Sequence, residues 1–228
     1  MVGTGTVTPT KADAERRPGL PVLHRSSAVL LAVAVLTGAA AKAADESRVS
    51  WLGDLGTYPA MWVAALALIA SFSSGVREAA LRSGPFFSAM CGAYYAWALA
   101  VLGFGGSGRF LVLWLVVAVL AVPPLAAALS WAFSRGGPLA WTVVATVAAV
   151  PLTSGSLWQL WWAYVQRDAP DGFPLRPVQA LVDAAVVVLV VGVLPLRRST
   201  RAGALLLLLP IAWTMGQLAD PLRRLLPS

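Results

Sequence analysis

Residues 109–133 read RFLVLWLVVAVLAVPPLAAALSWAF, and no charged side chain follows Arg109 in this stretch. A helix needs about 20 apolar residues to cross a hydrocarbon core of about 30 Å. Backbone groups in lipid must bond within the segment, and the stretch lacks the period-two alternation that is typical of barrel strands. It therefore predicts a membrane-spanning helix, with a kink at Pro123-Pro124 because proline removes an intrahelical hydrogen bond.

Six further apolar stretches of similar length flank this one. They cover residues 26–44, 58–75, 84–103, 138–157, 177–196 and 202–219. Hydrophobic residues make up 58% of the 228-residue chain and charged residues only 12%, whereas an average soluble protein is about a quarter charged. The sequence predicts an all-α fold, a polytopic transmembrane helix bundle of seven spans over residues 26–221. A polar, basic cytoplasmic tail at 1–25 precedes the bundle, and a short basic tail at 222–228 follows it.

The first apolar stretch is open to a second interpretation. Basic residues precede it, and Ala41-Lys42-Ala43 near its end has the small-x-small form of a signal-peptide cleavage site. A cleaved leader would leave six spans. Pro151 and Pro210 predict further kinks, and small residues at four-residue spacing predict helix contacts. These small residues are Ala34 and Gly38 in the first stretch, and Ala67, Ser71 and Gly75 in the second.

The positions of Lys and Arg favour a cytoplasmic N-terminus. With that threading, ten of the 17 basic residues lie inside and seven outside. The inner ones are Lys11, Arg16, Arg17, Arg25, Arg77, Arg82, Arg135, Arg197, Arg198 and Arg201. The bias toward Ala, Val, Leu, Gly and Arg is typical of a high-GC bacterial genome, so the predicted location is the bacterial plasma (inner) membrane. Aromatic residues at Trp51, Tyr58 and Trp62, and from Trp158 to Tyr164, predict interfacial anchors.

Ionisable residues inside apolar stretches are candidates for function, because charge is costly in lipid. Three pairs of polar residues, in or next to the stretches 26–44, 177–196 and 202–219, lie toward the predicted outer face. Together they would form a polar vestibule. Its candidate residues are Lys42, Asp45, Gln179, Asp183, Gln217 and Asp220. The alternative is that Lys42 pairs locally with Asp45 or Glu46 and that Asp220 is solvated, and the sequence favours this alternative for those two residues. For Asp183 neither interpretation is favoured.

Several chemistries lack the residues they need. His24, in the tail, is the only histidine, and Cys91 is the only cysteine. Nucleophile pairs that use histidine, disulfides, and metal sites built from cysteine and histidine are therefore not expected within the membrane. The string Gly105-Gly106-Ser107-Gly108 lacks the lysine of a phosphate loop and predicts a turn. We expect no enzyme activity, no cofactor, no metal and no nucleic-acid partner.

One part of the chain resembles a known kind of protein. The run from Ala41 to Ser47, the run from Trp51 to Ala60, and Tyr94-Tyr95-Ala96-Trp97 resemble an uncharacterised family of small multi-pass integral membrane proteins from high-GC bacteria. The resemblance covers residues 26–100 and implies no activity. It implies that the first stretch is retained, since the motif starts before Lys42 and continues beyond it.

The sequence thus predicts an integral membrane protein that is transporter-like or permease-like, with a small polar vestibule and a small-molecule substrate that the sequence does not identify. The alternative is a non-catalytic membrane scaffold or partner subunit. Its partners would be the lipid bilayer and another membrane protein.

Overall fold

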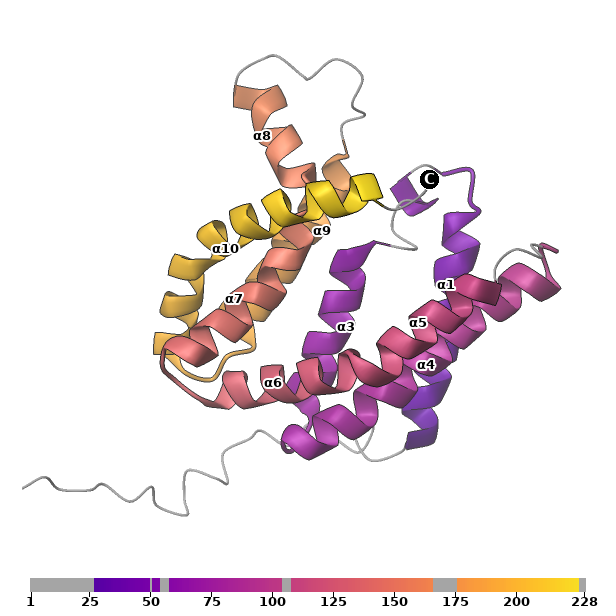
Figure 1. The fold of residues 1–228 in the computed structure, drawn as a ribbon, viewed down its shortest axis with the longest axis horizontal. Coiled ribbons are helices and arrows are strands. Elements are labelled where there is room, and N and C mark those ends of the chain that lie inside the picture. Colours follow the sequence, from indigo (N-terminus) through magenta and orange to yellow (C-terminus); the bar gives the residue numbers. More distant parts are fainter. Residues whose placement is uncertain (1–26, 50, 54–57, 104–107, 166–175, 226–228) are drawn as a thin grey trace, which may run out of the picture.

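The computed structural model describes residues 27–49, 51–53, 58–103, 108–165 and 176–225 (Figure 1). Within these ranges the regular structure is helical and there is no strand, which confirms the predicted all-α fold. The helices are α1 (Ser27–Asp45), α3 (Pro59–Phe72), α4 (Val76–Ala100), α5 (Gly108–Leu120), α6 (Val122–Ser134), α7 (Pro138–Leu152), α8 (Ser156–Val165), α9 (Pro177–Val187), the π-helical turn η2 (Val188–Val193) and α10 (Arg198–Leu225). The tail with His24, and most of the Gly105–Gly108 string, lie outside the described residues.

Each of the seven predicted stretches contains a helix, but the helices differ in length. Three are long and apolar enough to cross a membrane: Ser27–Asp45, Gly108–Ser134 and Arg198–Leu218. The pair α7 and α8 makes a fourth if it is one bent span. Helix α3 and the pair α9–η2 are shorter apolar helices. A helical bundle therefore fits the chain, and the count of seven spans stays a prediction.

Two helices extend beyond the apolar stretches of the sequence. Helix α4 begins at Val76, eight residues before the start of the third stretch, and α10 continues to Leu225. Arg223 and Arg224 therefore lie in the last turns of α10.

Proline marks both the starts and the breaks of the helices. Pro59, Pro138 and Pro177 occupy first turns, where a missing N–H costs nothing. Pro151 lies in the last turn of α7, and α8 continues at an angle of 60° to α7, which confirms the kink predicted there. Near Pro123-Pro124 the helix is interrupted only at Ala121, between α5 and α6.

Two apolar clusters form the interior. One is built around α7, with side chains from α3, α6, α9, η2 and α10, and the other is built around α4, with side chains from α1, α3, α5 and α6. Helices α3 and α6 contribute to both clusters and run between the α1–α4 side and the α7–α10 side of the molecule (Figure 1). The two clusters are therefore joined through shared helices.

Small residues let the helices approach closely. Half of the buried residues of α6 and α7 are alanines, and a Cβ atom added to Gly38 of α1 would lie 2.1 Å from the backbone oxygen of Met90 in α4. Ala34 is fully buried one turn before Gly38, so the predicted contact face of α1 is confirmed. Of the second predicted face, Ala67 is fully buried in α3, but Gly75 does not belong to it, because α3 ends at Phe72 and a Cβ atom on Gly75 would meet nothing within 4 Å.

Large apolar side chains point outward instead. On four different helices, leucine side chains are exposed, among them Leu36 (68%), Leu120 (70%), Leu181 (71%) and Leu206 (77%). Small residues inside and large apolar residues outside is the distribution expected for helices that pack against each other within lipid. The outer surface of the described helices is thus suited to an apolar solvent.

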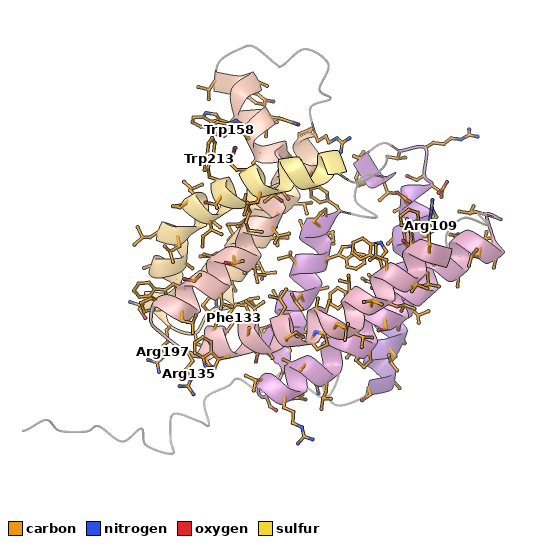
Figure 2. All side chains as sticks on the ribbon, in the orientation of Figure 1. Arg109, Phe133, Arg135, Trp158, Arg197 and Trp213 are labelled. Carbon is orange, nitrogen blue, oxygen red and sulfur yellow. The ribbon has the colours of Figure 1, made fainter. Side chains whose placement is uncertain are left out.

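The loops after α6 and after η2 are bound to each other at one end of the molecule. The Leu196 N–H donates to the Phe133 carbonyl at 2.8 Å, the Thr200 hydroxyl donates to the Arg135 carbonyl at 2.5 Å, and Arg197 Nε donates to the Ser134 carbonyl at 3.3 Å. Figure 2 shows Arg135 and Arg197 close to Phe133 at this end, with Arg109 on the opposite side of the molecule. Two loops that were predicted to share the cytoplasmic side therefore lie together.

Candidate functional site

Helix α9 turns its polar residues toward the interior. Pro177 opens the helix, and Gln179, Ala180, Asp183 and Val186 form its buried face. The positions i, i+4 and i+7 lie on one side of a helix, so Gln179 and Asp183 share a face, as predicted. This face packs against α3, α7 and α8. The Asp183 side chain has no solvent exposure.

Tyr58 reaches Asp183 from the start of α3. It precedes Pro59, lies in an extended conformation as the residue before the helix, and is only 7% exposed. Its hydroxyl donates to Asp183 Oδ2 at 2.6 Å. A tyrosine predicted to anchor the chain at the membrane interface therefore lies in the interior, because its hydroxyl has a buried carboxyl partner.

Two serines join this pair from the break between α7 and α8, Ser154 at the Asp183 carboxyl and Ser156 at the Tyr58 hydroxyl. Around Pro151 the last backbone hydrogen bonds of α7 run from an N–H to the carbonyl three residues earlier, and the helix ends there. Gly155 then takes a left-handed conformation with φ of 80°. Ser154 Oγ lies 3.0 Å from Asp183 Oδ2, and Ser156 Oγ lies 3.1 Å from Tyr58 Oη. Gly155 lies between the two serines, and its left-handed conformation, which glycine adopts readily, redirects the chain at the 60° bend between α7 and α8. We call Asp183, Tyr58, Ser154 and Ser156 the Asp183 cluster.

The Asp183 cluster holds more oxygen contacts than hydroxyl hydrogens. Five hydroxyl or carboxyl oxygen pairs lie at hydrogen-bond distance, between 2.6 and 3.2 Å. Tyr58, Ser154 and Ser156 supply one hydrogen each. Asp183 Oδ1 has no hydrogen-bond partner, and the only other buried side-chain atom in this condition among the described residues is Trp141 Nε1. The cluster therefore has fewer hydrogen-bond donors than oxygen contacts, and one oxygen of its acid has no donor.

No cation from the surrounding helices balances this acid. Helices α3, α7 and α8 and the turn η2, which make the main contacts of α9, contain no Lys, Arg, His, Asp or Glu in their described ranges. An ionised carboxylate costs several kcal/mol to bury without a partner of opposite charge. Within the described helices that pack on α9, Asp183 is thus the one charged or acidic side chain of the interior.

A second polar cluster lies between α1 and α4. Lys42 Nζ lies 3.2 Å from Asp45 Oδ2 and 2.5 Å from Glu46 Oε1, and the Tyr94 hydroxyl donates to Asp45 Oδ2 at 2.7 Å. Lys42 Nζ also lies 5.3 Å from the centre of the Tyr94 ring. Lys42 therefore pairs with its own helical neighbours, which confirms the local alternative.

The six predicted vestibule residues do not meet in one site within the described part of the chain. Lys42 and Asp45 belong to the contact of α1 with α4, whereas Gln179 and Asp183 face α3, α7 and α8. Gln217 is exposed on α10, and the Asp220 side chain lies outside the described residues. The structure thus divides the predicted vestibule and leaves Asp183 as its buried acidic residue.

Sequence reasoning missed the three hydroxyl residues of the cluster. Tyr58 was interpreted as an anchor, and the two serines were not singled out. A signal existed in the order Pro151, Thr153, Ser154, Gly155, Ser156, because a proline followed by hydroxyl residues and a glycine interrupts an apolar helix and places polar atoms at the break. Among the described residues no three His, Cys, Asp or Glu side chains gather as a metal site.

No protein-family model, curated protein or solved structure matches this chain.

Proposed function

We propose that this chain is a transporter-like or permease-like integral membrane protein of the bacterial plasma membrane, with the Asp183 cluster as its functional centre. Three helices, or four, are long and apolar enough to cross a membrane, and leucine side chains cover the outer surface. The proposed threading has seven spans and a cytoplasmic N-terminus. It is supported by the loops at Arg135 and Arg197, which were both assigned to the cytoplasm and bind each other.

The first span is retained in this proposal. A removed leader would have no reason to fit the rest of the chain closely, yet Ala34 and Gly38 pack against α4, and Tyr94 of α4 bonds to Asp45. Support for a retained α1 therefore comes from contacts at two levels of the same helix pair.

The observation that carries the functional proposal is the position of Asp183. A fully buried acid without a cationic partner destabilises a helical bundle, so a chain that keeps one is expected to use it. The acid faces the break between α7 and α8, and in transporters broken helices bring polar backbone and side-chain groups to the substrate or ion site. An acid at such a break can bind and release a ligand while the surrounding helices stay packed.

A scaffold role is the second candidate, and one observation favours it. The hydroxyl groups of the Asp183 cluster connect α3, the α7–α8 break and α9, so the cluster also holds three helices together. In a scaffold this connection would be its whole purpose. An uncharged residue of the same shape would then serve as well as the acid.

Replacing Asp183 by Asn separates the two candidates. The gene is deleted in the source bacterium, its growth phenotypes are recorded, and the deletion is complemented with wild type, Asp183→Asn and Asp45→Asn at matched levels of protein in the membrane. We expect Asp183→Asn to fail and Asp45→Asn to restore growth, because Asp45 belongs to a local ion pair. Full complementation by Asp183→Asn would contradict the transporter-like proposal and leave the scaffold.

A further inference from the structure

The hydrogen count of the Asp183 cluster points to a missing proton. The five oxygen contacts require five hydrogens if each is a hydrogen bond, and the three hydroxyls supply three. A proton on Asp183 adds a fourth donor and removes the buried negative charge. Oδ1 then becomes the carbonyl oxygen of a neutral acid, whose lack of a partner costs about 1–3 kcal/mol. An unpartnered oxygen of an ionised carboxylate is far more costly.

The spacing of the oxygens favours a proton over a metal cation. Tyr58 Oη and Ser154 Oγ lie 2.6 and 3.0 Å from Asp183 Oδ2, and the remaining contacts are no longer than 3.2 Å. These are the distances of O–H···O bonds, with one hydrogen between two oxygens. A sodium ion placed among these oxygens would have to push them apart.

Among the described residues packed on α9, no charged group neutralises Asp183, so a proton is the neutralising group that remains. Tyr58 is the one titratable residue that α3 and its first turn present, and α7 and η2 present none. Helix α8 carries Tyr164, which is 78% exposed, and Arg176 before α9 is exposed two turns away from Asp183. No Lys, Arg or His within the elements packed on α9 is therefore placed to stabilise the ionised form.

We propose that the Asp183 cluster is a binding site for one exchangeable proton, which Asp183 carries and which Ser154 connects to the outside of the site. On binding, the carboxylate takes one proton and becomes a neutral carboxylic acid, and on release the same proton returns to water. Ser154 is the half-buried member of the cluster, whereas Tyr58 and Ser156 are buried. Its hydroxyl can accept the proton from Asp183 on a lone pair while it gives its own hydrogen to water, so the count of hydrogens is unchanged.

In the proposed transporter, the proton bound at this site is the coupling ion, and this role rests on the proposed function. Binding and release of the proton change the charge of Asp183 at the helix break, so they can change how α3, α7 and α9 pack against each other. Binding itself does not need transport. The two proposals therefore fail separately.

Infrared difference spectroscopy of the purified full-length protein tests the site. A neutral carboxylic acid absorbs at a C=O frequency well separated from the bands of ionised carboxylates. We expect one such band at neutral pH in the wild type, its loss in Asp183→Asn, and its persistence in Asp45→Asn. The band should shift in D₂O, because the proton exchanges, and it should disappear as the pH is raised within the range where the protein stays folded.

A second variant keeps the test sharp if Asp183→Asn does not fold. Tyr58→Phe removes one hydroxyl partner of the acid, so the band should move to higher frequency with its area unchanged. Four results would overturn the proton site: no carboxylic acid band, a band that remains in Asp183→Asn, a band indifferent to D₂O and pH, or a band lost on adding sodium chloride but not choline chloride. An absent band together with failed complementation by Asp183→Asn would reject the proton and keep the transporter-like function. A titrating band together with full complementation by Asp183→Asn would keep the proton site and reject the transporter-like function.

Discussion

Tyr58 and Asp183 are separated by 125 residues in the sequence, yet the Tyr58 hydroxyl donates to Asp183 Oδ2 at 2.6 Å. The bond joins the first turn of α3 to the buried face of α9. Its length lies within the range of O–H···O bonds. The pair thus fixes how two helices from opposite halves of the chain face each other.

Tyr58→Phe should lower the stability of the protein. The ring keeps its packing, but Asp183 Oδ2 and both serines lose a partner, and a buried polar group without its bond costs about 1–3 kcal/mol. We expect a lower thermal unfolding midpoint of the purified protein in detergent. Tyr164→Phe is the matched control, because Tyr164 is 78% exposed, and its midpoint should equal that of the wild type. Equal midpoints for the two variants would show that the Tyr58 hydroxyl is not bonded in the interior.

Gly155 should tolerate asparagine better than alanine. Its φ of 80° lies in the left-handed region, where a Cβ atom costs about 1–2 kcal/mol and where asparagine is less disfavoured than other residues. We therefore expect the order of unfolding midpoints to be wild type, then Gly155→Asn, then Gly155→Ala. A Gly155→Ala protein as stable as the wild type would argue against the left-handed turn that brings Ser154 to Asp183 and Ser156 to Tyr58.

Local features made most of the fold predictable. Each apolar stretch became helical because its backbone bonds are satisfied within the segment, and this holds whatever its neighbours are. The start of α4 was missed for a reason that hydropathy does not detect. Glu78 accepts hydrogen bonds from the N–H of Ser74, at 2.6 Å, and from its hydroxyl, and it also pairs with Arg82 one turn later. These polar contacts extend the helix at its N-terminus, where an apolar window ends.

The site was predictable only in part, because its contacts are long-range. Asp183 and Gln179 share one helix, so their common face follows from spacing alone. Tyr58 contacts Ser154 and Ser156 across 96 and 98 residues, and no periodicity encodes which helices will meet. The same limit explains the predicted vestibule. Lys42 has two acidic neighbours within about one turn of its own helix, and it pairs with both.

The threading predicts that the loops at Arg135 and Arg197 share one side of the membrane and that Arg109 lies on the other. Cysteines introduced one at a time at these positions, in a Cys91→Ser background, should react accordingly with a membrane-impermeant maleimide. In intact cells whose outer membrane has been made permeable, we expect labelling at 109 only. Disruption of the inner membrane should then expose positions 135 and 197. Labelling of 135 and 197 on different sides would contradict both the threading and the bonds between these loops.

The contact of α1 with α4 gives a prediction in which two glycine-to-alanine changes should have opposite effects. A Cβ atom on Gly38 would lie 2.1 Å from the backbone oxygen of Met90, which cannot move without shifting α4, whereas a Cβ atom on Gly92 would meet nothing within 4 Å. Both glycines are helical, so both changes gain about 0.5–1 kcal/mol of helix propensity. For Gly38→Ala a packing cost of about 1–3 kcal/mol opposes this gain.

We therefore expect Gly38→Ala to lower the unfolding midpoint in detergent and Gly92→Ala to leave it unchanged or raise it. The comparison also bears on whether α1 is part of the mature protein. If α1 were removed as a leader, Gly38 would be absent from the purified chain, and Gly38→Ala would have no effect on its stability. A lower midpoint for Gly38→Ala alone, with α1 detected by mass spectrometry of the intact protein, would thus support both the close packing of α1 on α4 and the retention of the first helix.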